Sequence, residues 1–481
     1  MNPLIDLLID FWWLTLPVGL IAVCFTVSTV VIAPIRRWWT RKAHARAVDD
    51  GYALPFDTGA QLLDIIIGDD STKSRNVGIA EKFGNCLSIS QTGSALLLGA
   101  TGSGKTEAGK VLIRQMNADE NEPVVVYDHK DDYRRYFEEY ESDRDIIRIS
   151  SENSTDYWNL FREVEDEDGF DEISRAMFPQ TSNGGSEFFD TAARQLFTAV
   201  LKYLHRELDP SEQHNKALIN FFKRCDRVEM YERLSEHDDL MAAASAIDPE
   251  ADRQAAGVFA TLQQKVQDVF VGDFAEAGDF SVREYMDGPQ GRVLLLDNPI
   301  RQSEQVRPVF RFLVDHSAMH ALDDSSRWSY FVLDEFARID GLRRIGELVN
   351  VGRGQKVQLL ISLQSVSQLY DNYGRDRGNA ILSGLVTSII LRLQDAESIE
   401  YARTVIGSEF NEYTKHESRD EEGAVMETET TTEEEHSFAK GEFTEFEPGH
   451  GVVVRRNSWA YGYIAALDRS GAKPLLNVVN E

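Results

Sequence analysis

The segment Gly99–Thr106 limits the possible folds of this chain more than any other stretch. Its sequence, GATGSGKT, fits the pattern GxxxxGK[ST], whose glycines leave backbone N–H groups free to wrap a phosphate. An apolar run, Ala95–Leu98, precedes it, and apolar residues at helical spacing follow at Val111, Leu112 and Met116. The order strand, loop and helix predicts a nucleotide-binding α/β domain.

The loop chemistry predicts ATP and Mg²⁺ as cofactors. Lys105 is expected to bridge the β- and γ-phosphates, and Thr106 to ligate Mg²⁺. Asp128, at the end of the second predicted strand, is expected to contact the nucleotide site or, alternatively, to form a turn. The predicted nucleotide-binding residues are Gly99, Ala100, Thr101, Gly102, Ser103, Gly104, Lys105, Thr106 and Asp128.

A second apolar run, Tyr330–Leu333, ends in two carboxylates, Asp334 and Glu335. Beside a phosphate loop, this pattern predicts that Asp334 holds the magnesium shell and that Glu335 polarises the attacking water as general base. The alternative is an exposed strand end in an acidic chain. The second carboxylate favours an ATPase that couples turnover to motion.

A third run, Val357–Leu363, ends at Gln364 and follows Arg353. An amide at the tip of this strand can report on the γ-phosphate, and an arginine entering it can reach the phosphate of a neighbouring subunit. From the residues alone, the alternative is that Arg353 is a surface arginine and Gln364 an ordinary residue at the end of a strand.

Buried runs separated by helical patterns predict a mostly parallel sheet. The predicted strands are Ala95–Leu98, Val124–Tyr127, Ile146–Ile149, Val293–Leu296, Tyr330–Leu333, Val357–Leu363 and Ser388–Leu393, with two β-like runs at Val452–Arg455 and Tyr461–Ala466.

Residues 166–288 carry helical periodicity and no convincing strand, with predicted helices that include Ala217–Phe222, Met241–Ala246 and Ala255–Phe270. We therefore predict an all-α domain at 166–288, inserted into a nucleotide-binding domain formed by 79–165 and 289–481. Within the latter, 417–447 is expected to be an acidic flexible insertion, because nine of the nineteen residues from Glu417 to Glu435 are Glu or Asp.

The N-terminal region contains 25 consecutive uncharged residues, Phe11–Ile35. As a helix this segment would span about 37 Å, enough for a hydrocarbon core of roughly 30 Å. Basic residues from Arg36 to Arg46 follow this segment, and the only charged side chains before it are Asp6 and Asp10. A cleaved signal peptide has basic residues before its apolar core, so this charge distribution favours a membrane anchor. We expect a single-pass anchor in the cell membrane at 1–47, with the N-terminus outside, a linker at 48–78 and a cytoplasmic ATPase domain.

The net charge is −30, and of the 50 basic residues only 14 are Lys. An acidic, lysine-poor composition favours a halophilic source over an ordinary acidic protein. In molar salt the Debye length is about 3 Å, so this charge does not exclude nucleic acid as a partner. The doublets Arg134-Arg135 and Arg343-Arg344, together with Arg375 and Arg377, are expected to line a DNA path or to form surface ion pairs. The three cysteines lack disulfide or metal spacing.

Together, these motifs resemble the type IV secretion coupling proteins, the membrane-anchored DNA-pumping ATPases of conjugation. The resemblance rests on Gly99–Thr106, Tyr127–Lys130, Phe188–Arg194, Leu333–Arg338 and Gly352–Leu369 with its LQSVSQL run, and extends with gaps over about 80–470. It implies a RecA-like core and a homohexamer around a DNA channel. It also implies that Arg353, eleven residues before Gln364, acts on a neighbouring subunit.

The family further implies a relaxase or secretion-channel components as partners. The chain departs from many members in having one predicted span instead of two, and in its acidic insertion. Alternative functions are a related P-loop motor for secretion assembly or viral genome packaging, and an ATP-binding membrane scaffold without turnover.

Overall fold

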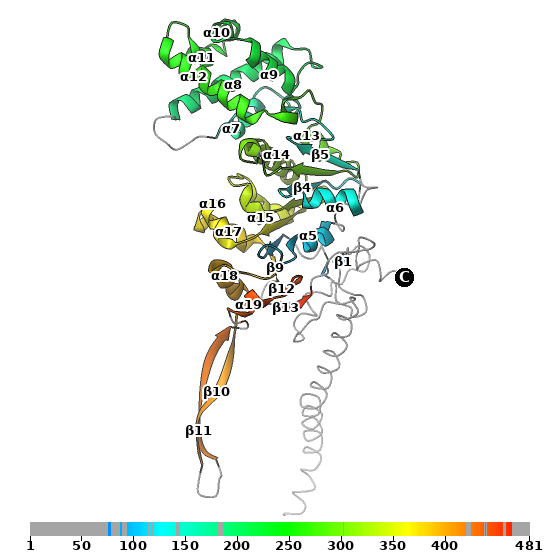
Figure 1. The fold of residues 1–481 in the computed structure, drawn as a ribbon, viewed down its shortest axis with the longest axis vertical. Helices are drawn as coiled ribbons and strands as arrows, with labels where there is room; N and C mark the ends of the chain where they lie inside the picture. The colour runs from blue at the N-terminus through cyan, green and yellow to red at the C-terminus, as the bar shows by residue number, and fades with distance from the viewer. Residues whose placement is uncertain are drawn as a thin grey trace, which may run out of the picture.

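The computed structural model describes residues 76–77, 87–88, 94–113, 116, 120–140, 145–179, 187–301, 303–419, 425–436, 438, 440–455 and 458–463. Its centre is a nine-stranded sheet with the order β13-β12-β9-β3-β8-β7-β4-β6-β5 (Figure 1). The strands are β3 (Ala95–Leu98), β4 (Val124–Asp128), β5 (Ile146–Ser150), β6 (Val293–Asp297), β7 (Ser329–Leu333), β8 (Val357–Leu363), β9 (Thr387–Ile390), β12 (His450–Arg455) and β13 (Ser458–Tyr463).

The strands from β9 to β5 in this order pair in parallel, whereas β12 runs antiparallel to β9 and β13 antiparallel to β12. The prediction of a mostly parallel sheet is therefore confirmed. The strand predicted at Ser388–Leu393 is shorter, because β12 pairs with β9 only as far as Ile390. The predicted run Tyr461–Ala466 lies outside the described residues after position 463.

Alternate residues of each central strand face opposite layers of helices. Leu97 packs in a cluster with α5 (Lys105–Ile113) and α6 (Asp132–Tyr140), whereas Leu96 and Leu98 belong to the cluster on the other face. All three leucines are fully buried, and burying one such side chain contributes about 2 kcal/mol. Burial on both faces explains why these strands are continuous apolar runs.

The second face is covered by a longer series of helices. α14 (Ser303–Asp323) buries a stripe that includes Val309, Phe310 and Leu313. The helices that follow are α15 (Ile345–Val351), α16 (Val366–Tyr373), α17 (Arg375–Gly384), α18 (Ala396–Ile406) and α19 (Glu442–Glu445).

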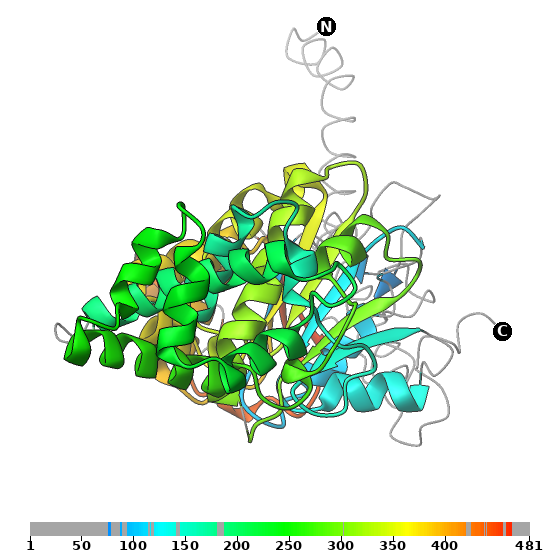
Figure 2. The same cartoon turned by 90° about the horizontal axis from the view of Figure 1, so that it is seen from above.

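Between β5 and β6 the described chain is helical, apart from one isolated bridge between Trp158 and Phe280. The helices α8 to α12 gather at one end of the molecule in Figure 1 and lie nearest the viewer in Figure 2. The predicted helical segments are confirmed, while the division into domains stays a prediction. The helices are α7 (Gly169–Met177), α8 (Glu187–Glu207), α9 (Asn215–Arg224), α10 (Arg227–Ser235), α11 (Met241–Ala244), α12 (Asp252–Val269) and α13 (Val282–Asp287).

The region predicted as a flexible acidic insertion, 417–447, contains regular and buried structure in its described part. First, β10 (Ser408–Arg419) and β11 (Val425–His436) pair as an antiparallel ribbon that projects from the core (Figure 1). Threonine and valine favour strands, and pairing satisfies the backbone without apolar burial. Second, Phe443 and Phe446 of the following segment are buried.

The predicted N-terminal anchor and most of the predicted linker lie outside the described residues. Before Ser94, the structure describes only β1 (Asn76–Val77) and β2 (Leu87–Ser88). Among the described helices, none combines the length and apolar character needed to cross a bilayer.

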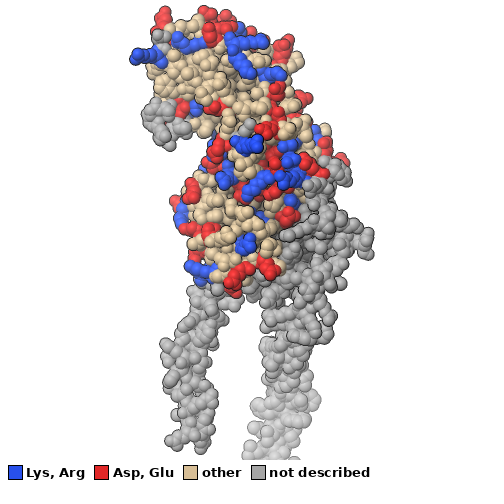
Figure 3. All heavy atoms as spheres, viewed as in Figure 1, with Lys and Arg blue, Asp and Glu red and all other residues tan. Residues whose placement is uncertain are grey.

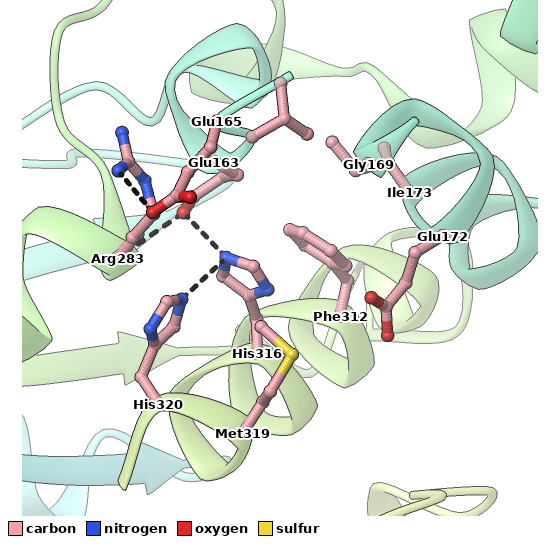
Figure 4. Close-up of a pocket in the computed structure, with 11 residues that line it drawn as sticks. Glu163, Glu165, Gly169, Glu172, Ile173, Arg283, Phe312, His316, Met319 and His320 are labelled. Carbon is pink, nitrogen blue, oxygen red and sulfur yellow. Dashed lines mark hydrogen bonds and ion pairs between the residues drawn. The ribbon is translucent and has the colours of Figure 1, made fainter. Parts of the chain in front are cut away.

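A pocket of about 270 Å³ lies between α7 and α14, where the helical region meets the sheet domain (Figure 4). The wall of this pocket includes Glu163, the last residue of the 3-10 helix η4 (Leu160–Glu163). The carboxylate of Glu163 is fully buried. Its donors are the Trp158 indole, the Ser281 hydroxyl, the Val282 and Arg283 amides and the His316 imidazole, at 2.8–3.3 Å. Glu163 thus joins η4, α13 and α14.

The His316 and His320 rings, four residues apart on α14, contact neighbouring side chains. His316 stacks on Phe312 and lies between Glu163 and His320, with the two imidazole Nε2 atoms 3.4 Å apart (Figure 4). No group of three or more His, Cys, Asp or Glu in the described part of the chain has the arrangement of a metal site.

Glu163→Gln is expected to lower the free energy of unfolding by about 3 kcal/mol, because an amide cannot accept from all five donors. Burial favours a higher pKa for Glu163, but the hydrogen bonds from His316, Val282 and Arg283 outweigh it and lower the pKa. The carboxylate therefore stabilises the fold above the ordinary glutamate pKa of about 4.3, and this contribution is lost as the pH falls through the lowered value.

Denaturant titrations between pH 3 and 7 measure this effect. The matched control is Glu165→Gln on the same pocket, where the side chain is 81% exposed and a small change is expected. Equal stability losses in the two variants would contradict the role assigned to Glu163.

Candidate active site

The phosphate loop connects β3 to α5 and is anchored at both sides by main-chain bonds. Gly99 N–H donates to the Leu363 carbonyl of β8, and Ala100 N–H donates to the Arg392 carbonyl. Gly102 and Gly104 adopt φ values of 73° and 103°, which side chains disfavour. The strand pairing thus fixes a loop conformation that requires glycine.

The loop residues fit a bound nucleotide phosphate. A Cβ on Gly99 would lie 2.5 Å from Ser103 Oγ, so no larger residue fits there. Ser103 Oγ is buried and has no hydrogen-bond partner, and Lys105 Nζ donates to the loop's own Gly99 carbonyl at 2.5 Å. Burial lowers the pKa of Lys105. A buried cation and an unpaired hydroxyl beside N–H-rich turns form an anion cradle.

Two carboxylates lie at the same edge of the sheet as this cradle, because β7 pairs in parallel with β8, and β8 pairs in parallel with β3. Asp334 N–H donates to the Tyr127 carbonyl at 3.1 Å, and both Asp334 and Glu335 are buried. Burial, together with the charge of Glu335, raises the pKa of Asp334 to about 6. Glu335 has φ 45° and ψ 48°, an unusual backbone conformation for this residue type.

The oxygen ligands that Mg²⁺ prefers are available at the same edge. Thr106 lies in the first turn of α5, and its hydroxyl donates to Asp132 Oδ2 at 3.3 Å. With the carboxylate of Asp334, these oxygens fit a hard cation that keeps several waters. The donor set therefore agrees with the predicted metal ligands Thr106 and Asp334.

Of the two roles expected for Asp128, contact with the nucleotide site or formation of a turn, the structure shows the second. Its carboxylate accepts the N–H groups of Lys130, Tyr133 and Arg134 at 3.0–3.2 Å and caps the start of α6. Burial raises the pKa of Asp128 to about 7, and the negative charge of Asp334 also raises it, whereas the hydrogen bonds from the backbone lower it. Asp128 thus fixes the loop after β4, while its carboxylate oxygens are used by backbone donors.

Gln364 belongs to the site, and Arg353 lies apart from it. Gln364 Nε2 donates to Thr101 Oγ1 at 2.8 Å, which joins the end of β8 to the phosphate loop. Arg353 lies in the 3-10 helix η8 (Gly352–Gln355), before β8 begins. Because β8 has seven residues, its two ends are roughly 20 Å apart, so Arg353 is far from the phosphate loop of its own chain.

The structure adds several residues to this edge that no sequence pattern predicts. Lys130 Nζ contacts Glu335 Oε1 at 2.5 Å, Asp132 contacts Thr106, and Gly449 N–H donates to the Ser103 carbonyl at 2.8 Å. Lys130 was part of the family resemblance, but its role had no sequence signal. Gly449 is distant in sequence and is reached only through the fold.

The candidate DNA-path arginines have ordinary structural partners. Arg134 pairs with Asp131 and Glu138, Arg344 with Glu347, and Arg375 with Glu397. Arg377 donates to the Leu342 carbonyl and lies over the ring of Tyr373. In Figure 3 the Lys and Arg side chains lie among Asp and Glu side chains. The surface ion-pair interpretation fits Arg134, Arg344 and Arg375, whereas Arg377 contacts a carbonyl and a ring. Arg135 and Arg343 are exposed, and a place on a DNA path stays a prediction for them.

Gly104→Ala is expected to weaken nucleotide binding at least tenfold. The added Cβ would require φ +103° in a residue other than glycine and would lie 3.1 Å from Gly449 N. Titration with a fluorescent ATP analogue measures the loss. Gly346→Ala is the control, since a Cβ there meets nothing within 4 Å. Unchanged affinity in Gly104→Ala would contradict the assigned loop geometry.

The fold of this chain is similar to that of solved structures. No curated protein sequence matches the chain. Among solved structures, the bacterial conjugative coupling protein TrwB with residues up to 70 deleted, in complex with sulphate, is 18% identical with a TM-score of 0.66, over 87% of this chain and 95% of that one. The plasmid coupling protein TrwB in complex with ADP and Mg²⁺ is 18% identical with a TM-score of 0.64, over 87% and 94%. These similarities show that the fold is that of TrwB, with its RecA-like core.

The family comparison covers most of the chain. The family model of the type IV secretion-system coupling protein DNA-binding domain matches residues 87–459, a span that begins at β2 and ends within β13. This span includes the phosphate loop, the two carboxylates and Gln364. The chain therefore belongs to the type IV secretion-system coupling protein family.

Proposed function

We propose that this chain is a membrane-anchored ATPase that couples ATP hydrolysis to DNA translocation in type IV secretion. The observation that carries the proposal is the carboxyl edge of the sheet, where Lys105, Glu335 and Gln364 converge in a chain of this family. The similar TrwB structures with ADP and Mg²⁺ and with an ATP analogue support ATP and Mg²⁺ as the cofactors.

Each residue of the site has a distinct role in this proposal. The Gly99–Thr106 backbone and Lys105 hold the phosphates, while Thr106 and Asp334 hold Mg²⁺. Glu335 takes a proton from the attacking water, and Gln364, already bonded to the loop, orients groups at the γ-phosphate. Bound Mg²⁺ would supply charge neutralisation at the phosphates.

The position of Arg353 supports a ring of subunits. The segment that carries Arg353 precedes β8, and the phosphate loop lies at the other end of this strand, roughly 20 Å along it, so a neighbouring subunit's loop is the better candidate for contact with Arg353. We infer a homohexamer in which Arg353 acts as a finger in trans, around a channel for DNA.

The remaining parts of the proposal rest on the sequence. The uncharged stretch Phe11–Ile35 and the basic residues after it support a single-pass anchor with the ATPase domain in the cytoplasm. At the membrane, the partners are DNA and a relaxase or secretion-channel components. The acidic composition supports a halophilic source.

Glu335→Gln should abolish most ATP hydrolysis while retaining ATP binding, because the amide cannot take up the proton. Phosphate release with and without DNA, together with nucleotide titration, separates the two properties. Glu347→Gln, whose side chain is 56% exposed on α15, serves as the control with unchanged turnover. Normal hydrolysis by Glu335→Gln would overturn the assignment of the base.

Mixed oligomers test the trans role of Arg353. Arg353→Ala and Lys105→Ala should each be almost inactive, since removing a trans finger costs about 10³-fold in turnover. In coassembled oligomers, some interfaces join an intact Lys105 to an intact Arg353, so hydrolysis should reappear. Mixed oligomers that form by two-tag pull-down and stay inactive would exclude action in trans.

A further inference from the structure

The shortest polar contact of Glu335 is with a lysine that the proposed mechanism does not use. Lys130 Nζ donates to Glu335 Oε1 at 2.5 Å, from the loop between β4 and α6. The Glu335 side chain is 6% exposed, whereas that of Lys130 is 37% exposed. One partner is fixed inside the site and the other reaches it from solvent.

The main chain on both sides of this pair is firmly held. Lys130 N–H donates to Asp128, and the next residue, Asp131, has φ 61°. The backbone of Glu335 is in the left-handed conformation, and its carbonyl accepts a hydrogen bond from the Arg338 N–H. The pair can therefore separate by rotation of the long Lys130 side chain, without movement of either backbone.

Charge couples this pair to the phosphate cradle. Besides burial, which acts most strongly, the charge of Lys130 lowers the pKa of Lys105, while Glu335 and Asp334 raise it. The carboxylate of Asp132 also raises the pKa of Lys105. In this acidic surrounding Lys105 contacts the Gly99 carbonyl and Lys130 contacts Glu335. A γ-phosphate adds negative charge beside this set, and ADP lacks that group.

We propose that Lys130 senses the γ-phosphate: its ammonium is held by Glu335 in the nucleotide-free protein and is transferred to the phosphate of ATP, which releases the carboxylate for the water. The inference rests on the proposed function, because it takes Glu335 as the base. In this proposal, the loop after β4 distinguishes ATP from ADP.

A binding cycle on the full-length protein tests the proposal without hydrolysis. The probes are a non-hydrolysable ATP analogue and ADP, each with Mg²⁺, titrated against wild type, Lys130→Met, Glu335→Gln and the double variant. Lys130→Met should weaken the analogue about tenfold, the size of one charge-assisted bond, and change ADP affinity less than twofold. Lys130→Arg, which keeps the charge, should retain more of the discrimination.

Glu335→Gln provides the decisive comparison. Removing the competing carboxylate frees Lys130, so the analogue should bind about threefold tighter, and this gain should disappear in the Lys130→Met background. A gain of equal size in both backgrounds would show simple relief of charge repulsion and overturn the proposal. Equal weakening of ADP and the analogue by Lys130→Met would overturn it as well.

A control and a parallel assay separate this inference from the proposed function. Arg134→Met removes a nearby cation that pairs with Asp131 and Glu138, and should leave both affinities unchanged. If wild type does not hydrolyse ATP, the proposed function fails whatever the binding cycle shows. If Glu335→Gln loses hydrolysis but the effects of Lys130→Met and Glu335→Gln on analogue affinity simply add in the double variant, the assignment of Glu335 as the base holds. In that case only the Lys130 proposal fails.

Discussion

The parallel pairing of β4 with β7 is the interaction on which the site depends. In this register Tyr127 lies beside Leu333, so the residues after the two strands emerge together at one edge. The Asp334 N–H continues the pairing by donating to the Tyr127 carbonyl. A shift of one residue would turn Asp334 to the other face of the sheet, away from Lys105. The apolar burial of both strands holds this register, so core packing and catalytic geometry have the same origin.

The sequence predicted the strands and the phosphate loop well because both follow local rules. Val124–Asp128 and Val357–Leu363 are buried on both faces and therefore appear as continuous apolar runs. The sequence failed where tertiary contacts decide. Thr-rich acidic residues 425–436 form a strand through backbone pairing with β10, and Phe443 is buried because its carbonyl accepts the Leu393 N–H and its ring packs on Phe438 and Phe446.

The same limit applies to the site. Asp334, Glu335 and Gln364 were predictable because each terminates an apolar strand at the edge where parallel sheets place their ligand groups. For Asp128, both alternatives matched the residue type, and only the hydrogen bonds to α6 distinguish them. The contact of Lys130 with Glu335 joins residues 205 positions apart, and no local pattern predicts it.

The two ends of β8 carry two residues to which the proposed mechanism gives separate roles. Gln364, at one end, is bonded to Thr101 of the phosphate loop, and Arg353 precedes the other end. Because β8 lies between β3 and β7 and is buried along its whole length, it cannot bend to bring the two ends together. A rigid strand of this kind has one end at the chain's own nucleotide and the other directed elsewhere. In the proposed ring of subunits, β8 would therefore join Gln364, beside the chain's own nucleotide, to the segment that carries Arg353.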